Sequence, residues 1–241
     1  MGEITKPSIT VVIPTLNEEK GIGPTLEEIR EALKDDVVGG NGVDATYLVV
    51  DGKSVDGTVE IAKKKGADVI IQQSARGKGA AISEALGHIN SDTRYILFID
   101  GDFTYPAEYI QPMLRILEKD HKVGMVTGNR FKRFLDPKRA MHNVNYVGNR
   151  LLAFTHYLVN GAKLKDPLTG LRIIRRDVLK GWRPISKGFD IEVELNHYIA
   201  KKGYVIVEIP IKYRKRLGEK KLKWRHGLTI LKRILSQSFP S

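Results

Sequence analysis

Short apolar runs and longer amphipathic stretches alternate along the first 110 residues. The runs are rich in β-branched and aromatic residues and predict buried strands at 9–13, 47–50, 68–71 and 95–99. The stretches between them carry apolar residues at helical spacing, as at Ile22, Leu26, Ile29 and Leu33, and predict helices. Strand–helix units joined by short connections predict an α/β fold, with a mostly parallel sheet and helices on both faces.

Residues 111–241 follow a less regular pattern. Strands are expected at 123–128, 171–174 and 205–209, and helices at 109–117, 143–159, 190–200 and 224–235. In the last of these helices Trp224, Leu228, Leu231 and Leu235 share one face, with Ile230 and Ile234 beside it. No stretch has the composition of a linker, so we predict one domain over 1–241.

Charge is distributed unevenly between the two halves. Residues 1–110 hold 11 Lys/Arg and 18 Asp/Glu, whereas residues 111–241 hold 29 and 10, so the net charges are −7 and +19. The second half is expected to face an anionic partner, with a solvated basic surface as the alternative. Nucleic acid is not expected as that partner, because aromatic residues are few (7%) and no nucleic-acid-binding motif is present. Cysteine is absent, which excludes disulfides and thiolate metal sites.

Two carboxylates follow the most apolar of the predicted strands. Asp100 and Asp102 flank Gly101 directly after the run at 95–99. Two acids at the end of a buried strand would cost several kcal/mol unless they were paired or metal-bound. Carboxylate oxygens suit Mg²⁺ or Mn²⁺, which also bind diphosphate oxygens, and Gly101 allows a ligand to approach the backbone. The buried strand favours this metal site over the alternative of an ordinary acidic turn.

Polar residues also follow the other predicted strands, where ligands bind in open parallel sheets. Asp51 can accept a hydrogen bond from a nucleobase or ribose; the alternative role of helix cap suits Asp56 better. Glu18 either contacts the base or stabilises the start of the following helix. Arg76 and Lys78, set among glycines before a helix, favour an anion.

Taken in order, these motifs resemble those of family 2 glycosyltransferases. The segments that carry the resemblance are 14–18, 49–58, 76–79 and 100–102. Further segments, 128–131, 166–172, 189–192 and 209–222, resemble the dolichyl-phosphate sugar synthases. The Asp-Gly-Asp-x-Thr-Tyr sequence and the pair Asn149-Arg150 resemble the archaeal dolichyl-phosphate hexosyltransferases that begin N-glycan assembly.

The resemblance covers nearly the whole chain and implies a Rossmann-like GT-A fold. It implies inverting, metal-dependent transfer of a hexose or N-acetylhexosamine from a nucleoside diphosphate sugar to dolichyl or polyprenyl phosphate, with Mg²⁺ or Mn²⁺ as cofactor. A nucleotide-binding half (1–110), an acceptor-binding half (111–211) and a basic amphipathic tail (212–241) are expected. The implied nucleotide-sugar contacts are Pro14, Glu18, Asp51, Arg76, Lys78, Asp100, Gly101 and Asp102, and the metal ligands are Asp100 and Asp102.

Basic residues of the second half are expected at the acceptor phosphate. They are Arg130, Arg172, Arg214, Arg216 and Lys221. Arg130 and Arg172 are also counted as catalytic, together with the two metal-binding aspartates. Asp166 and Glu192 either position the acceptor or form buried ion pairs with Arg172 or another basic residue.

Four positions depart from the family pattern. Gly52 replaces the second Asp of the Asp-Asp-Gly-Ser sequence of mannose synthases, and Thr104 stands where they place Gln. Both changes favour a UDP-sugar over GDP-mannose as donor. Thr169 replaces a Ser, and Lys215 stands at the position of an Arg.

The basic tail bears on the acceptor and the location. Residues 212–233 hold ten Lys/Arg and one Glu. The helix within them either lies on an anionic membrane or packs on the core with a wet basic back. No apolar run approaches the about 18–20 residues of a membrane span, and the N-terminus lacks the apolar region of a signal peptide. We expect a cytoplasmic protein, peripheral on the cytoplasmic face of the membrane. The alternative is a soluble glycosyltransferase for a small phosphorylated acceptor such as 3-phosphoglycerate.

Overall fold

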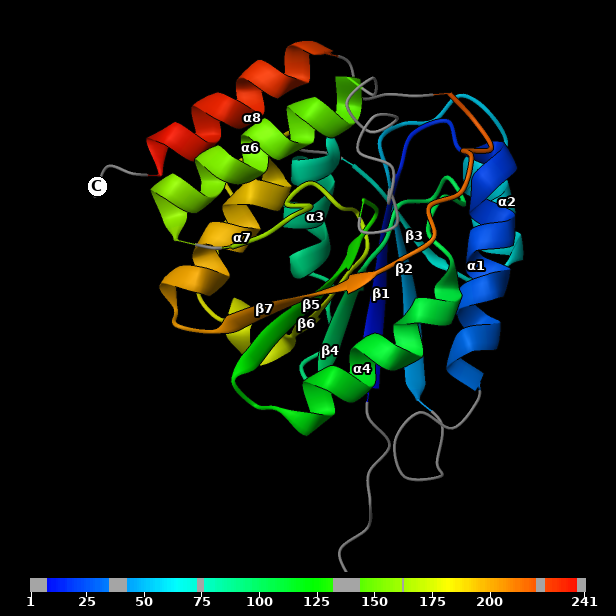
Figure 1. Ribbon diagram of the computed structural model, residues 1–241. Helices are drawn as coiled ribbons and strands as arrows, with labels where there is room; N and C mark the ends of the chain where they lie inside the picture. Colours follow the sequence, from blue (N-terminus) through cyan, green and yellow to red (C-terminus); the bar gives the residue numbers. More distant parts are fainter. Residues whose placement is uncertain are drawn as a thin grey trace, which may run out of the picture.

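The computed structural model describes residues 8–34, 43–72, 76–131, 144–161, 163–219 and 224–237 (Figure 1). Within these ranges one seven-stranded sheet has the order β3-β2-β1-β4-β6-β5-β7. The strands are β1 (Ser8–Thr15), β2 (Asp44–Asp51), β3 (Asp68–Ile71), β4 (Tyr95–Phe98), β5 (Val123–Asn129), β6 (Arg172–Arg175) and β7 (Val205–Pro210). Every strand expected from the apolar runs is present, with bounds that differ by a few residues.

The sheet is mostly parallel, as predicted. β1 pairs in parallel with β2 and β4, β2 with β3, and β5 with β7. β6 runs antiparallel to both of its neighbours, β4 and β5. The apolar run at 171–174 gave no sign of this reversal, because periodicity reports burial and not strand direction.

Helices cover both faces of the sheet. They are α1 (Glu19–Lys34), α2 (Thr58–Lys64), α3 (Lys78–Leu86), α4 (Ile110–Lys119), α6 (Val144–Asn160), α7 (Ile191–Lys201) and α8 (Trp224–Ser236), with short 3₁₀ turns η1 (Ala107–Tyr109) and η2 (Arg176–Leu179). On β1, Val11 and Ile13 face a core shared with α1 and α4, whereas Val12 faces a second core shared with α3 and α7. This alternation follows from the twofold period of side chains along a strand.

Helices α6 and α8 lie side by side at one end of the molecule (Figure 1). Ile230 and Ile234 of α8 are buried in a small core with Val193 of α7. Leu228 and Leu235 of α8 are instead exposed, at 63% and 48%. α8 therefore packs inward through Ile230 and Ile234, which lie beside the predicted stripe, and part of that stripe, at Leu228 and Leu235, meets solvent. Among the described residues, no helix is long and apolar enough to span a membrane.

Candidate active site

The carboxyl ends of β1 and β2 bring two of the predicted nucleoside contacts together. The strands pair in register, so Pro14 lies beside Val50 and Thr15 beside Asp51. The buried Asp51 carboxylate accepts hydrogen bonds from the Thr15 hydroxyl (3.0 Å) and from the amide (2.7 Å) and hydroxyl (2.6 Å) of Ser54. These bonds fix the carboxylate at the strand end. Its contact with a nucleoside stays a prediction.

Asp56 has the capping role that the sequence suggested. One oxygen of its carboxylate accepts from the Thr58 amide (3.1 Å) at the start of α2, and the other accepts from the Glu19 amide (3.2 Å) at the start of α1. A single carboxylate thus satisfies amides of two helix N-termini, where negative charge is favourable. Glu18, just before α1, donates its amide to the Thr58 hydroxyl (2.8 Å).

Asp100 and Asp102 lie directly beyond β4, each next to a cation. The Asp102 carboxylate accepts from the amide (3.0 Å) and hydroxyl (2.5 Å) of Thr104 through Oδ1, and its Oδ2 pairs with the Arg216 guanidinium. The Asp100 Oδ1 pairs with Lys78 Nζ at 2.6 Å. Thr104, at the position where mannose synthases place Gln, therefore orients Asp102.

The two carboxyl groups have opposite pKa shifts. Burial would raise the pKa of Asp100, but the nearby ammonium of Lys78 outweighs it and lowers that pKa. Burial and the negative charge of Asp100 together raise the pKa of Asp102. Lys78 and Arg216 offset part of this repulsion, and the raised pKa of Asp102 leaves a requirement for further positive charge at the pair.

A divalent cation fits this requirement. The donor set is carboxylate oxygen, which suits Mg²⁺ or Mn²⁺. In the part of the chain that the structure describes, no cluster of three or more His, Cys, Asp or Glu side chains is arranged for a metal ion. Asp100 and Asp102 could therefore supply only part of a coordination shell, and a bound diphosphate with water would supply the rest.

Glycines allow the backbone to crowd these aspartates. A Cβ atom at Gly170 would lie 2.3 Å from Asp100 Oδ2, and one at Gly21 would lie 2.5 Å from the Gly101 carbonyl oxygen. Both distances are far below an ordinary contact. Neither glycine could be singled out from the sequence, because a glycine that is required by packing looks like any other glycine in a single sequence.

Lys78 is held between two carboxylates. Its Nζ lies 2.6 Å from Asp100 Oδ1 and 2.7 Å from Glu192 Oε1, and its side chain is only 10% exposed. Burial alone would lower the pKa of Lys78, but the two carboxylates raise it above its ordinary value. For Glu192, the ion-pair alternative is the one that the structure supports, with Lys78 and not Arg172 as partner.

The start of α3 is already occupied by protein groups. The amides of Gly79 and Ala80 donate to the carbonyls of Gly188 and Lys187, each at 3.1 Å. The helix N-terminus was expected to face an anion, but these two amides already donate to carbonyl groups of the protein. Arg76, just before the helix, is exposed.

The segment that follows β7 crosses the two aspartates. The amide of Arg214 donates to the Thr104 carbonyl (2.9 Å), and the amide of Leu217 donates to the Asp102 carbonyl (3.3 Å). Arg216 reaches Asp102 through Nη2 and Glu18 through Nη1 (3.3 Å). Its guanidinium thus links the carboxylate predicted to hold the metal with the one predicted to contact the nucleoside.

Arg214 points to a different partner. It forms a two-pronged ion pair with Glu28 of α1, and its guanidinium lies 4.5 Å from the ring centre of Phe103. Of the predicted acceptor-phosphate residues, Arg216 lies against the aspartates and Arg214 lies against α1. Lys221 is outside the described residues.

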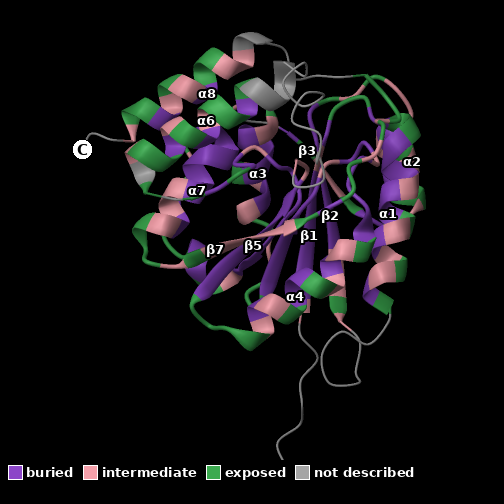
Figure 2. Cartoon of the chain, viewed as in Figure 1, coloured by how far each residue is buried: buried purple, intermediate pink, exposed green. Residues whose placement is uncertain are grey.

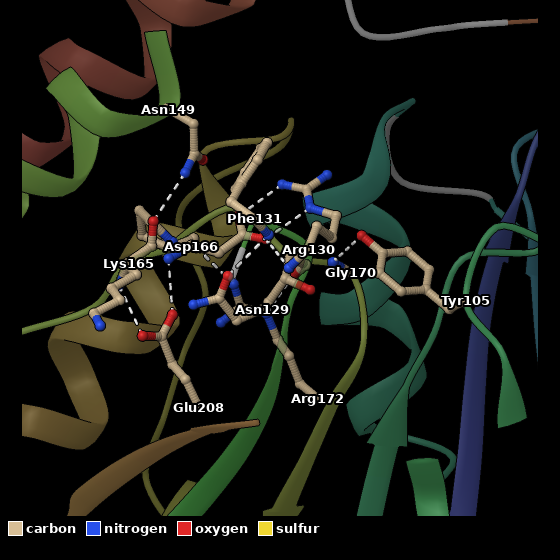
Figure 3. Close-up of polar contacts among 12 residues, drawn as sticks. Tyr105, Asn129, Arg130, Phe131, Asn149, Lys165, Asp166, Gly170, Arg172 and Glu208 are labelled. Atoms are coloured by element: carbon tan, nitrogen blue, oxygen red, sulfur yellow. Dashed lines mark hydrogen bonds and ion pairs between the residues drawn. The ribbon is translucent and has the colours of Figure 1, made fainter. Parts of the chain in front are cut away.

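Arg130, at the end of β5, is aimed by Asp166. Its Nε and Nη2 donate to the two carboxylate oxygens of Asp166, each at 2.8 Å, and its amide donates to Oδ2 at 3.0 Å (Figure 3). The Tyr213 ring lies 5.3 Å from the guanidinium carbon, and Tyr213 packs edge-on against Tyr105. For Asp166, too, the ion-pair alternative holds, with Arg130 as partner. Both tyrosines lie in segments that carry the resemblance, but sequence reasoning assigned neither of them a role at the site.

Arg172 lies beneath this cluster and is fully buried. Its guanidinium donates to the carbonyls of Thr169 (2.8 Å) and Pro167 (2.7 Å) and to the Asn196 side chain (2.6 Å). Burial lowers the pKa of Arg172. In this state its hydrogen bonds hold the 167–169 turn in place. Its expected contact with an acceptor phosphate stays a prediction that requires the turn to rearrange.

An open α/β sheet with an acidic pair at a central strand end and basic residues from the second half around it is the arrangement that the resemblance to GT-A glycosyltransferases implied. The domain pattern of glycosyl transferase family 2 matches residues 10–182. The chain belongs to this family.

Curated relatives support the assignment. The chain is 35% identical over 224 residues to a dolichyl-phosphate hexose transferase of Haloferax volcanii, covering 92% of this chain and 90% of that protein. It is 34% identical over 213 residues to glycosyltransferase AglJ of the same organism, covering 87% of this chain and 64% of AglJ. The chain thus spans less than two thirds of AglJ.

Solved structures share the fold. Glucosyl-3-phosphoglycerate synthase of Mycobacterium tuberculosis in complex with uridine diphosphate superposes with a TM-score of 0.73 at 21% identity, covering 98% of this chain and 82% of that one. A complex of the same enzyme with Mn²⁺, uridine diphosphate and phosphoglyceric acid has a TM-score of 0.73 at 20% identity, covering 98% and 80%. At this identity the likeness supports the fold alone.

Proposed function

We propose that the protein transfers a hexose or N-acetylhexosamine from a UDP-sugar to dolichyl or polyprenyl phosphate, with Mg²⁺ or Mn²⁺, at the surface of a membrane. The observation that carries this proposal is the convergence on the β4 strand end of two aspartates, Asp100 and Asp102, with cations supplied by both halves of the chain. Lys78 comes from the first half and Arg216 from the second. The dolichyl-phosphate hexose transferase relative supports the acceptor class.

The proposed reaction depends on electrostatic stabilisation more than on general acid–base catalysis. An acceptor phosphate is mostly ionised at neutral pH, since its second pKa is about 6, and is already a nucleophile. A divalent cation at Asp100 and Asp102 would stabilise the diphosphate leaving group as a Lewis acid. The residues of the chain have to hold the acceptor in line with the sugar and offset its repulsion from the donor. Single displacement at the anomeric carbon inverts its configuration.

The surroundings of Arg130 support a role at the acceptor phosphate. Its Nε and Nη2 are fixed by Asp166, whereas its Nη1 has no hydrogen bond among the described residues, and the side chain is 18% exposed. A guanidinium held on one edge presents the other edge to an anion without further loss of side-chain entropy. Arg216 supplies a second cation beside the acidic pair, and it would become available to a phosphate if a metal took its place at Asp102.

The lipid acceptor is favoured by the outer face of α6 and α8. Figure 2 shows exposed residues along both helices. The apolar ones among them are between 46% and 65% exposed. They are Leu151, Phe154, Tyr157, Leu158, Leu228 and Leu235. Exposed apolar groups on paired helices, with the basic Arg150 and Lys232 among them, are typical of surfaces that lie in the headgroup region of anionic membranes. A small soluble acceptor would not require an exposed apolar surface on α6 and α8.

One assay tests the proposal. The protein is incubated with Mg²⁺ or Mn²⁺, a polyprenyl phosphate and a panel of UDP- and GDP-sugars, and the lipid fraction is examined for glycolipid. We expect transfer from a UDP-sugar that stops when the metal is chelated. Transfer to 3-phosphoglycerate and none to polyprenyl phosphate would select the soluble alternative, and salt-dependent DNA binding without nucleotide-sugar turnover would contradict both.

The membrane face has its own test. Phe154→Asp and Leu228→Asp are expected to lower sedimentation with vesicles of anionic phospholipid. Ile185→Asp, at a position that is 69% exposed and outside α6 and α8, serves as the matched control. Equal sedimentation of all three variants would contradict docking through these helices.

A further inference from the structure

The turn at residues 165–166 is held from two sides by residues that the proposed mechanism does not use. Glu208 on β7 accepts the Lys165 amide through Oε2 (2.8 Å) and the Asp166 amide through Oε1 (2.7 Å). Asn149 on α6 donates its side-chain amide to the Lys165 carbonyl (3.1 Å). Figure 3 shows these two side chains converging on the same turn from different elements.

The 165–166 turn also determines the position of the Arg130 side chain. Asp166 is the residue whose carboxylate binds Arg130 through both prongs and through the backbone amide. The Asp166 carboxylate is fully buried, and Asn149 is only 5% exposed. Contacts within the protein, and not solvent, therefore determine where both side chains lie. A shift of the 165–166 backbone therefore moves the carboxylate that determines where the Arg130 guanidinium lies.

We propose that Asn149 and Glu208 are positioning residues for Arg130. They fix the 165–166 turn so that Asp166 presents the free edge of the Arg130 guanidinium to the acceptor phosphate. The acceptor part of this inference rests on the proposed function; the geometric part does not. Neither residue contacts the acceptor itself.

The chemistry of Glu208 suits this task. Its two oxygens accept two adjacent backbone amides, an arrangement that only an ionised carboxylate matches in full, because a glutamine would place an NH₂ group against one amide donor. Loss of one such bond leaves a buried amide unsatisfied, and the turn has to move to recover it. Burial raises the pKa of Glu208, although the two amides oppose the rise, so protonation at acidic pH acts in the same direction as the glutamine substitution.

Asn149 ties the same turn to α6. This helix carries several of the exposed apolar side chains proposed to meet the membrane. The single hydrogen bond from Asn149 to the Lys165 carbonyl therefore joins the docking face to the residue that aims Arg130. Asn149→Ala removes this tie without touching Asp166 or Arg130.

The test compares Glu208→Gln and Asn149→Ala with the wild-type chain. For transfer to polyprenyl phosphate, we expect KM for the acceptor to rise about tenfold in Glu208→Gln, the size of one lost charge-assisted hydrogen bond, and severalfold in Asn149→Ala. KM for the UDP-sugar is expected to change less than about twofold in both, because Asp51, Asp100 and Asp102 keep their contacts. An equal rise of both KM values would overturn the proposal.

A second readout needs no substrate. The Nε–H of Arg130, bonded to Asp166, is expected to give a distinct ¹H–¹⁵N resonance, assigned by its loss in Arg130→Lys. It is expected to shift or broaden in Glu208→Gln and in Asn149→Ala. An unmoved resonance in both variants would refute the geometric claim, whether or not the protein uses polyprenyl phosphate.

The chain offers a matched control. Glu194 also accepts two adjacent amides, those of Ile185 (3.0 Å) and Ser186 (2.7 Å), but in a different loop. Glu194→Gln is expected to lower the melting temperature about as much as Glu208→Gln and to leave the Arg130 resonance in place. If Glu194→Gln shifted the Arg130 resonance as much as Glu208→Gln does, the shift would reflect a general loss of stability. The positioning role would then be rejected. Should Glu208→Gln fail to fold, Asn149→Ala decides the question.

Discussion

Gly170→Ala adds a single carbon atom beside a predicted metal ligand. The new Cβ would lie 2.3 Å from Asp100 Oδ2, 2.7 Å from Cγ and 2.9 Å from Oδ1. Neither partner moves freely. The Gly170 amide donates to the buried Tyr105 hydroxyl (2.7 Å), and Asp100 is paired with Lys78 at 2.6 Å. The backbone φ at Gly170 is not positive, so an alanine brings no conformational strain of its own.

The size of the effect follows from the overlap. An ordinary contact to a Cβ begins near 3.4 Å, so the Asp100 carboxylate has to move by about 1 Å. A displacement of about 1 Å at a reacting group typically costs about 10²-fold in rate. The distorted side chain costs a further ~1 kcal/mol in stability, which a domain of this size tolerates. We therefore expect turnover to fall about a hundredfold in a folded protein.

The assay combines three measurements on the same preparation. These are sugar transfer to polyprenyl phosphate, calorimetric binding of UDP with and without Mn²⁺, and thermal unfolding. Gly87→Ala is the control, because the atom nearest to its Cβ would lie at an ordinary 3.6 Å and Gly87 is at the far end of α3. Full activity of Gly170→Ala with unchanged Mn²⁺-dependent UDP binding would show that the position of Asp100 does not matter to the reaction.

Three further substitutions test other contacts. Arg216→Met is expected to strengthen binding of Mn²⁺ alone severalfold, measured by electron paramagnetic resonance, because the guanidinium and the ion compete for Asp102; equal or weaker binding would contradict the competition. Lys78→Met is expected to lower the free energy of unfolding in urea by about 3 kcal/mol, since it leaves the buried Glu192 carboxylate and the partly buried Asp100 carboxylate without their shared cation; a loss below about 1 kcal/mol would show that these ion pairs are not needed. At Asp56, burial raises the pKa of the carboxyl group, but hydrogen bonds from Thr58 and from the Glu19 amide outweigh burial and lower that pKa below 3.8. The ionised Asp56 therefore stabilises the fold at neutral pH, and this stabilisation is lost as the pH falls through the pKa of Asp56 in the folded protein. Asp56→Asn is therefore expected to cost about 1 kcal/mol at pH 7 and progressively less below pH 4; a constant difference across that range would refute this assignment.

The strand and helix pattern was predictable because it depends on local periodicity. Runs such as 95–99 are buried on both faces, and α1 shows its apolar stripe directly in the sequence. The antiparallel course of β6 and the face on which α8 packs were not predictable. Both depend on contacts with elements distant in the chain, and Ile230 and Ile234 looked no more suited to burial than Leu228.

The site shows the same division. Asp100, Asp102 and Asp51 stood out because acids at the ends of buried strands need a reason. Lys78 and Arg130 were recognised as cations, but their carboxylate partners were left open, since pairs that are 22 or more residues apart leave no trace in spacing. The support of Arg130 by Glu208 and Asn149 was invisible for the same reason: each contact joins a side chain to the backbone of a distant turn.

Calorimetric titration of UDP into the protein, with and without Mn²⁺, tests the central claim that Asp100 and Asp102 bind the metal–diphosphate. Asp102→Asn keeps the shape of the side chain and removes its charge. We predict that Mn²⁺ strengthens UDP binding to the wild-type protein and that Asp102→Asn abolishes this strengthening while metal-free binding persists. The same Mn²⁺-dependent gain in both proteins would contradict the assignment of the site.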